Sequence, residues 1–278
     1  MAKAMAASAK GIFNMPLNAE HLRKVLDEHG FEVAFQPRVI VTTGRLTGFE
    51  IYARWNHEEL GYISPIEFIQ LAKKRELIDT LTQEVLNAGL PVFAEIAKRI
   101  PNLSLSVNIS PVSFTHSDFL QRLLESCVAF DLAPSQIILE FPELEIYQNM
   151  EVFAESLMRY QRAGFRIALD DFGTGESNAL MIEKLKLSEI KIDVAVIKAI
   201  KTSKEAEFLA KAALKLANQS GILATAEGVE TEETMEHIKL LGFDMAQGYY
   251  IAHPMSASAL EAWLRQHSHT SAQAQEKF

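Results

Sequence analysis

The chain has 278 residues, of which 48% are hydrophobic and 23% charged, and its formal net charge is −9. This composition fits a globular protein with a substantial core, built as one large domain or two small ones. The negative charge argues against a nucleic acid polymer as partner, whereas a bound divalent cation would still allow a small phosphorylated ligand. The sequence has no apolar run of about 18 residues and no signal-peptide core, so we expect no membrane span and a cytoplasmic protein.

Three segments differ in composition. We expect residues 1–16 to be a leader or linker, residues 17–265 to form a folded domain and residues 266–278 to be a polar tail. The histidines of the tail, His267 and His269, are expected to be solvated rather than to bind a metal.

The first part of the folded domain predicts two strands followed by helices. Residues 31–42 and 45–55 have the composition of strands around a Thr-Gly turn, which predicts a hairpin-like antiparallel pair. A helix begins at Pro65, and apolar residues at helical spacing continue to Gly89 and Pro91, where we expect the helix to break or kink. An antiparallel strand near the start is therefore part of the prediction.

From residue 103 onward, strands are expected to alternate with helices. The expected strands cover residues 103–108, 136–140, 166–170, 189–193, 222–227 and 243–249. One helix carries Cys127, which we expect to be a small buried hydrophobe, and further helices are expected over 196–219 and 231–240. This alternation predicts a parallel sheet, and about eight strands in one domain favour a closed (β/α)8 barrel.

The most informative stretch is the apolar run 167–169, which ends in Asp170 and Asp171 and is followed by Phe-Gly-Thr-Gly. The run has the pattern of a buried strand, and the small residues after it predict a loop. In a parallel α/β barrel the carboxyl ends of the strands form the active site, so two adjacent carboxylates there indicate a divalent cation and a phosphate. The alternative, a turn stabilised by an Asp side chain, would explain only one of the two.

Other strands also end in side chains that carry oxygen atoms. These are Glu50, Asn108, Glu140, Asp193, Glu227 and Gln247, with Glu143 and Glu230 close by. Two carboxylates about 4 Å apart repel by roughly 4 kcal/mol at an effective dielectric constant near 20, so such a cluster should raise several pKa values or recruit cations. We expect cations, and the all-oxygen ligands favour Mg²⁺ or Mn²⁺ over Zn²⁺. The double Asp would let one carboxylate bridge two ions, an arrangement that activates water in phosphoester cleavage.

Strand parity places Lys191 and Asp193 on the same side of their strand. Lys191 would then position or polarise an attacking water, or neutralise charge in the transition state. A structural ion pair is the alternative for this lysine, and the spacing alone leaves both open.

These residues follow the order and spacing of a known family. The chain resembles the EAL domains, TIM-like (β/α)8 barrels that cut the bacterial second messenger cyclic di-GMP to linear pGpG, over about residues 17–262. The matching pieces are Phe35-Gln36-Pro37, Gly48-Phe49-Glu50, Arg54-Trp55 with His57, Ser106–Ser110, Leu139-Glu140 with Glu143, Asp170–Gly175, Lys191–Asp193, Ala226–Thr231, and Gln247–Tyr249 with Pro254. Each piece alone is weak evidence, but their joint order is specific.

The resemblance implies a role for each matching position. Catalytic roles fall to Glu50, Lys191 and Glu227, the last two beside the attacking water. The implied metal ligands are Glu50, Asn108, Glu140 and Asp170 for one ion, and Asp170 with Asp171 for the second. Substrate contacts fall to Gln36, Arg54, Asp193 and Gln247, while Glu143 and Glu230 support the loops of the site. The implied cofactor is a pair of Mg²⁺ or Mn²⁺ ions.

The signature triplet of the family is Glu-Ala-Leu, and here it reads Glu50-Ile51-Tyr52. The glutamate ligand is kept, and the change affects two residues that pack behind or beside the dinucleotide. Further departures are Glu58 after His57, Lys73 in place of an acidic residue, Glu76 in place of glycine, Pro142 in place of threonine, and Glu176 and Asn178 in the loop after the double Asp. None of them removes a metal ligand, so they argue for altered affinity or looser coupling of that loop to the metals.

Three functions are compatible with these residues. The first is a two-metal phosphodiesterase that hydrolyses cyclic di-GMP to pGpG. The second is a weakly active or inactive EAL-type domain that acts as a cyclic di-GMP receptor or protein-interaction module, for which Tyr52 and Glu176 argue. The third is an unrelated metal-dependent barrel lyase, which leaves Asn108 and Gln247 unexplained. In the family the loop at 174–179 lies at a dimer interface and sensory domains are common, so we also expect a homodimer and an upstream regulatory domain or partner protein.

Overall fold

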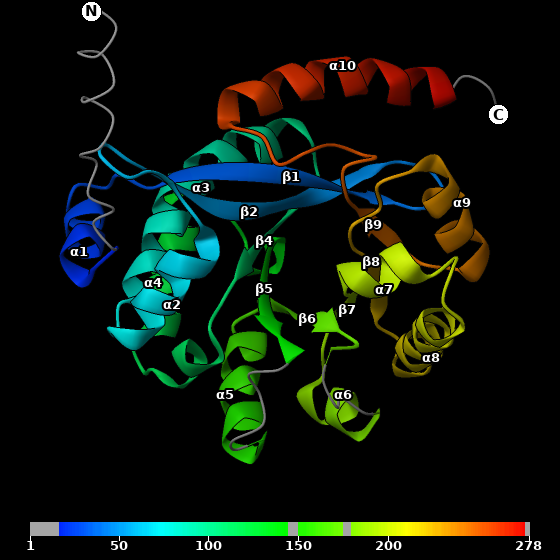
Figure 1. Cartoon of the computed structure of the whole chain (residues 1–278), viewed down its shortest axis with the longest axis horizontal. Coiled ribbons are helices and arrows are strands. Elements are labelled where there is room, and N and C mark those ends of the chain that lie inside the picture. Colours follow the sequence, from blue (N-terminus) through cyan, green and yellow to red (C-terminus); the bar gives the residue numbers. More distant parts are fainter. Residues whose placement is uncertain (1–16, 144–149, 175–178, 276–278) are drawn as a thin grey trace, which may run out of the picture.

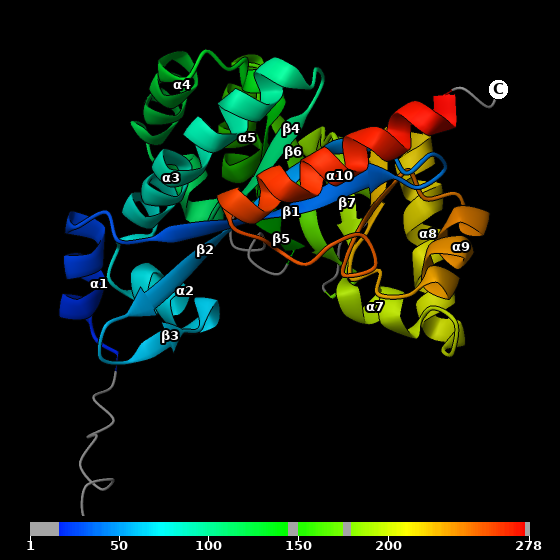
Figure 2. The same ribbon diagram turned by 90° about the horizontal axis from the view of Figure 1, so that it is seen from above.

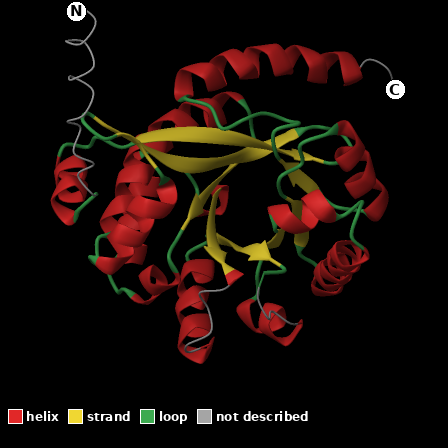
Figure 3. Ribbon diagram, viewed as in Figure 1, coloured by secondary structure: helices red, strands yellow, loops and turns green. Residues whose placement is uncertain are grey.

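The computed structural model describes residues 17–143, 150–174 and 179–275. Within these ranges, eight strands close into one barrel in the order β1, β2, β4, β5, β6, β7, β8 and β9 (Figures 1 and 3). Their bounds are Glu32–Ile40, Leu46–His57, Ser104–Asn108, Ile137–Pro142, Arg166–Phe172, Glu189–Ile192, Leu223–Ala226 and Met245–Gln247. β1 is antiparallel to its neighbours β2 and β9, and the other neighbouring pairs in the barrel are parallel. The predicted (β/α)8 barrel with an antiparallel strand near the start is confirmed.

Helices surround the strands on the outside (Figure 1). The bounds of α1 to α10 are Ala19–Asp27, Pro65–Lys74, Ile78–Arg99, Phe119–Ala129, Met150–Arg162, Ala179–Leu185, Val194–Ala199, Lys204–Ser220, Glu232–Leu241 and Ala257–Gln275. Short 3₁₀ helices cover Pro111–Thr115 and Pro134–Gln136, and a short strand, β3 (Gly61–Ile63), pairs with the end of β2. α10 lies along the outer side of β1 in both views (Figures 1 and 2). None of the described helices is both long enough and apolar enough to cross a membrane.

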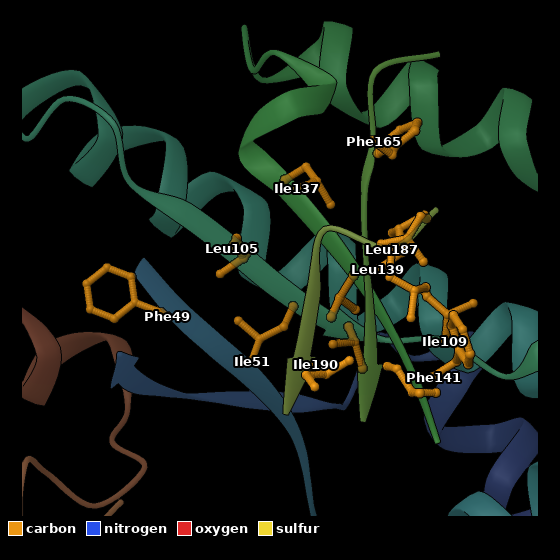
Figure 4. Close-up of a cluster of buried hydrophobic side chains, with 14 of the residues drawn as sticks. Phe49, Ile51, Leu105, Ile109, Ile137, Leu139, Phe141, Phe165, Leu187 and Ile190 are labelled. Carbon is orange, nitrogen blue, oxygen red and sulfur yellow. The ribbon is translucent and has the colours of Figure 1, made fainter. Parts of the chain in front are cut away.

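The two faces of the strands carry different side chains. Apolar residues on the outer face of the strands pack under the helices. They include Phe49 and Ile51 of β2, Leu105 of β4, Leu139 of β5 and Ile190 of β7 (Figure 4). Successive side chains of a strand point to opposite faces, so the residues between these apolar positions face the barrel interior. The buried polar residues therefore gather inside the barrel. They include Arg38, Glu50, Ser106, Glu140, Glu189, Lys191, Thr225 and Gln247.

α3 differs from the prediction because it continues through Pro91 to Arg99. A proline inside a helix costs about 3 kcal/mol, but full burial of each large apolar side chain contributes roughly 1.5–3 kcal/mol, and Leu90 and Phe93 are buried on either side of it. Gly89 makes room for a neighbour, since a Cβ at this position would lie 3.1 Å from the Cδ1 atom of Ile51. The prediction was a break or a kink at Gly89 and Pro91, and the break was wrong.

The long helix predicted over 196–219 is two helices, α7 and α8. Ser203 separates them, because its side chain accepts a hydrogen bond from Ala206 N and so caps α8. This cap was visible in the sequence as a serine before a helical pattern. The backbone of α10 runs to Gln275 and thus continues beyond residue 266, where a tail was expected to begin. The expected leader at residues 1–16 lies outside the described residues.

Candidate metal centre

Side chains from several strand ends meet inside the barrel around Lys191. Its Nζ atom lies 2.9 Å from Glu50 Oε2, 2.7 Å from Glu140 Oε2, 3.2 Å from Asp170 Oδ1 and 2.6 Å from Glu227 Oε1. The lysine and Glu140 are fully buried, and Glu50 is only 3% exposed. One ammonium group therefore faces four carboxylates, and it cannot neutralise all of them.

The excess of negative charge is reflected in the pKa values. Burial and the neighbouring carboxylates raise the pKa of Glu140 to about 8, although Lys191 partly opposes this change. Burial, with Asp170 beside it, also raises the pKa of Glu227 well above its ordinary value. Burial would raise the pKa of Glu50 too, but Lys191 and the hydrogen bonds from Gln247 and Asn108 lower it. The site thus holds charged carboxylates only at a cost in free energy that a cation would reduce.

Two overlapping groups of carboxylates are close enough to share a cation. Glu50, Glu140 and Asp170 form one group and Asp170, Asp171 and Glu227 the other, with the ligand oxygens of each group within 4.8 Å of one another. Glu140 Oε1 is buried and has no hydrogen-bond partner among the described residues. An all-oxygen donor set with an unused buried oxygen fits Mg²⁺ or Mn²⁺.

Asn108 reaches the same centre from the end of β4. Its Nδ2 donates to Glu50 Oε1 at 2.7 Å, and parallel pairing of β4 with β5 places Asn108 opposite Glu140. With the nitrogen of the amide turned to Glu50, the amide oxygen is left to act as a ligand. The structure therefore brings together all five residues that were predicted as metal ligands.

The loop after Asp170 and Asp171 has an unusual backbone conformation and a hydrogen bond to a neighbouring carboxylate. Asp171 has a backbone φ of +55°, which is uncommon for a residue other than glycine and is tolerated best by Asn and Asp. The carboxylate of Glu143 accepts a hydrogen bond from Gly173 N at 2.9 Å, the contact expected for a group that fixes this loop. Burial, Asp170 and Asp193 raise the pKa of Asp171 to about 6.

The predicted substrate residues Gln36 and Gln247 lie beside the carboxylates. Gln247 Nε2 is 2.9 Å from Glu50 Oε2 and 3.1 Å from Gln36 Oε1, and Gln36 Nε2 donates to Ala252 O at 3.0 Å. Tyr52, which was not predicted as a site residue, joins them through its hydroxyl group. Strand parity was the available signal, because Tyr52 stands two residues after Glu50 and must face the same interior.

The remaining predicted residues are farther from the carboxylates or have other contacts. The guanidinium of Arg54 lies over the ring of Tyr52, 5.5 Å from its centroid, and Nη1 donates to Ala53 O. The carboxylate of Asp193 caps α7 by accepting a hydrogen bond from Ala195 N at 2.8 Å. Glu230 pairs with Lys198 at 2.9 Å and is 41% exposed, so the structure places it at the rim. Glu176 and Asn178 lie outside the described residues.

Two cavities open beside the cluster. One of about 260 Å³ has an apolar wall from α2 and α3 and reaches Arg54, Asn108, Asp170 and Asp171. The other, of about 220 Å³, is lined by Gln36, Glu227, Glu230, Gln247 and Tyr249 among others. The cluster is thus accessible from two sides to a ligand with more than one polar group.

The fold and the site together define a barrel with a buried acidic cluster at the carboxyl ends of its strands. The model of the EAL domain matches residues 19–254, so the chain belongs to the EAL domain family. It is 36% identical over 238 residues to the cyclic di-GMP phosphodiesterase PA2567 of Pseudomonas aeruginosa, which covers 86% of this chain and 40% of that protein. It is 30% identical over 230 residues to the cyclic di-GMP phosphodiesterase RocR of the same organism. This match covers 83% of this chain and 59% of that protein. The chain therefore spans less than two thirds of either relative.

Solved structures show the same architecture. A PaMucR phosphodiesterase in complex with c-di-GMP has a TM-score of 0.82 at 29% identity, and the match covers 87% of this chain and 98% of that chain. The EAL enzyme Bd1971 in its form bound to cAMP and cyclic di-GMP has a TM-score of 0.81 at 26% identity, with coverage of 87% and 66%.

Proposed function

We propose that this chain hydrolyses cyclic di-GMP to linear pGpG in a reaction that needs two Mg²⁺ or Mn²⁺ ions. The observation that carries the proposal is the meeting of five carboxylates from four strand ends, four of which contact one buried lysine. The names of the relatives and the dinucleotide bound in related structures support the choice of substrate.

The residues that would hold the ions follow from the two carboxylate groups. Glu50, Asn108, Glu140 and Asp170 would bind one ion, and Asp170 and Asp171 the second. When bound, such ions lower the pKa of water and neutralise charge on the phosphodiester. Mg²⁺ and Mn²⁺ are both compatible with these ligands.

The protein's own groups supply positioning and proton transfer. Lys191 holds the carboxylates of Glu50, Glu140 and Glu227 together in a buried site, where a fixed positive charge stabilises a phosphorane-like transition state most effectively. The carboxylate of Glu227 lies 2.6 Å from Lys191 Nζ and lines the smaller cavity, where it would accept a proton from the attacking water. As water attacks phosphorus, the P–O3′ bond breaks and the released 3′ oxygen takes up a proton.

The substrate would be oriented by residues at the edges of the cluster. The guanidinium of Arg54 lines the larger cavity and suits a phosphate or the edge of a guanine base. Gln36 and Gln247 line the smaller cavity and present amide groups. Asp193, which caps α7, would contact the ligand only through its second oxygen.

A receptor without turnover is the second candidate, and Tyr52 is the observation that favours it. The family has an aliphatic residue at this position, whereas the hydroxyl of Tyr52 is bonded to two predicted substrate residues. If cyclic di-GMP bound while the hydrogen bonds of Tyr52 to Gln36 and Gln247 stayed in place, we would expect binding without cleavage.

One incubation separates the two candidates. The purified chain is mixed with cyclic di-GMP and either Mg²⁺ or Mn²⁺, and the products are separated by chromatography. We expect pGpG from the wild type and from Glu236→Ala, which removes a carboxylate that is 62% exposed on α9, but none from Glu50→Ala. Tight binding of cyclic di-GMP by the wild type with no pGpG would replace the phosphodiesterase by the receptor.

The assembly is also a proposal. We infer a barrel domain over residues 17–265, a homodimer, an upstream regulatory domain or partner protein, and a cytoplasmic location. Residues 175–178 of the loop expected at the dimer interface, with Glu176 among them, lie outside the described residues. Sedimentation of the wild type and of Glu176→Tyr tests the dimer, since the aromatic replacement should strengthen association.

A further inference from the structure

Tyr52 stands at the junction between the carboxylate cluster and its two cavities. It follows Glu50 by two residues on β2, so both side chains face the barrel interior. Among the described residues, it is the one that lines both cavities. An aliphatic side chain at this position would fill part of the same space but would form no hydrogen bond.

The hydroxyl of Tyr52 belongs to a directed chain of hydrogen bonds. Gln36 uses its amide nitrogen for Ala252 O at 3.0 Å, so its oxygen is left to accept from Tyr52 at 3.1 Å. The tyrosine oxygen then accepts from Gln247 Nε2 at 2.9 Å.

This series of hydrogen bonds ends at Glu50, a predicted metal ligand. Gln247 Nε2 also donates to Glu50 Oε2 at 2.9 Å, so the hydrogen bond that Gln247 donates to Tyr52 helps to set the orientation of the amide that holds this carboxylate. Groups that orient a ligand through a hydrogen bond typically change metal affinity by about 10–100-fold when they are removed. The hydroxyl of Tyr52 acts on Glu50 through one additional hydrogen bond. We therefore expect its removal to change metal affinity by an amount at the low end of this range.

The ring of Tyr52 has a second contact. The guanidinium carbon of Arg54 lies 5.5 Å from the ring centroid, within the range of a cation–π interaction. An aliphatic residue offers no such face, so the ring restrains Arg54 in the cavity that also reaches Asp170 and Asp171.

We infer that Tyr52 is a positioning residue with two separable parts: its hydroxyl orients Glu50 toward the metal through Gln247, and its ring orients Arg54 toward the phosphate of the substrate. The part that concerns the ring rests on the proposed function. The part that concerns the hydroxyl needs only the metal.

The first experiment measures Mn²⁺ binding by calorimetry without nucleotide. Tyr52→Phe keeps the ring and removes only the hydroxyl, and we expect about tenfold weaker Mn²⁺ binding. In a Gln247→Leu background the same change should have no further effect, because the mediating amide is gone. Tyr62→Phe, on a tyrosine that is 60% exposed on β3, is the matched control and should bind Mn²⁺ like the wild type. Wild-type affinity of Tyr52→Phe, or an equal loss in both backgrounds, would overturn the inference.

The second experiment measures hydrolysis of cyclic di-GMP at saturating Mn²⁺. Tyr52→Phe should leave KM within about twofold of the wild type because the ring remains, whereas Tyr52→Leu should raise KM at least about fivefold. Equal KM values for the two variants would remove the role of the ring. If the wild type produces no pGpG, the proposed function fails, whereas the calorimetric result still decides the role of the hydroxyl. Circular dichroism confirms folding, and if Tyr52→Leu does not fold, Tyr52→Met takes its place.

Discussion

Two positively charged side chains buried inside the same barrel, Arg38 and Lys191, differ in how well nearby carboxylates balance their charge. Arg38 of β1 is 2% exposed, and its guanidinium donates to both oxygens of Glu189, at 2.8 and 3.0 Å, and to Ser104 Oγ at 3.1 Å. Thr225 donates to the same carboxylate, and Arg166 lies 3.9 Å from it. In this Arg38 cluster, the buried carboxylate has positive charge beside it and hydrogen bonds to both of its oxygens.

Lys191 lies only two residues after Glu189 on β7, yet its surroundings are the opposite. It contacts four carboxylates, and Glu140 keeps one oxygen without a partner among the described residues. Glu189 begins β7 and Lys191 approaches its carboxyl end. The difference teaches that an ion pair with balanced charge supports the fold at one end of the strands, whereas an excess of carboxylates creates a demand for cations at the other.

The largest effect is expected when the Arg38 cluster, in which the charges are balanced, is broken. Arg38→Met should lower the free energy of unfolding by about 3–5 kcal/mol, because Glu189 is left buried without its main partner. Urea unfolding in EDTA and in Mn²⁺ should give the same loss, since no metal is expected there. The double variant Arg38→Met with Glu189→Leu should recover much of it, and a loss repaired by Mn²⁺ would contradict the separation of the two clusters.

The same substitution at the other cation should give a smaller loss that depends on metal. In EDTA, Lys191→Met should lower the free energy of unfolding by about 1–3 kcal/mol, because the carboxylates can take up protons when the ammonium is removed. Mn²⁺ should raise the melting temperature more for the variant than for the wild type, since the cation replaces the missing charge. Equal shifts in both proteins would mean that Lys191 and metal do not share these carboxylates.

A third test uses pH. Burial raises the pKa of Glu140 to about 8 and that of Asp171 to about 6, so protons compete with the metal below these values. Mn²⁺ affinity, measured by calorimetry, should rise at least about tenfold from pH 6 to pH 8. Affinity that does not change over this range would show that neither carboxyl group must lose a proton.

The metal-free protein should respond to pH in the opposite direction. A carboxyl group with a raised pKa binds more protons when folded than when unfolded, where its pKa is about 4.5. The contribution of Glu140 is therefore fully present below pH about 4.5 and is lost as the pH rises through 8. Differential scanning calorimetry in EDTA should show this decline, and saturating Mn²⁺ should reduce it.

The smallest effect is expected outside both clusters. Glu76 has a backbone φ of +57°, a conformation that costs a residue with a Cβ about 1–2 kcal/mol. Glu76→Gly should stabilise the chain by about 0.5–1 kcal/mol after the entropy of glycine is subtracted. The gain in urea unfolding should be equal with and without Mn²⁺, and a loss of stability would contradict the assigned strain.

Much of the candidate site could be anticipated because the chemistry is concentrated at strand ends. The apolar run before Asp170 and Asp171 predicted a strand that delivers two carboxylates, and the alternation of strands and helices predicted the barrel that brings Glu50 and Glu140 to them. These signals are local, since hydrophobic periodicity and turn residues are read within about ten residues of the chain.

Other features depend on contacts that no local pattern contains. The sequence did not decide whether Lys191 has a catalytic role or forms a structural ion pair. Only the tertiary structure shows that it contacts four carboxylates at once. α3 passes through Pro91 because buried side chains on both sides hold the helix. Tyr52 looked like a departure from a motif until its hydroxyl was placed between two glutamines.

By itself, the sequence determined the class of fold, the membership of the family and the identity of the residues at the strand ends, because these follow from the order and periodicity of side chains along the chain. The tertiary structure decided which charges balance one another. Arg38 and Glu189 are 151 positions apart, and Lys191 and Glu50 are 141 apart. Closure of the barrel sets how close these residues lie in space. The energy of a buried charge depends on every group within a few ångströms of it.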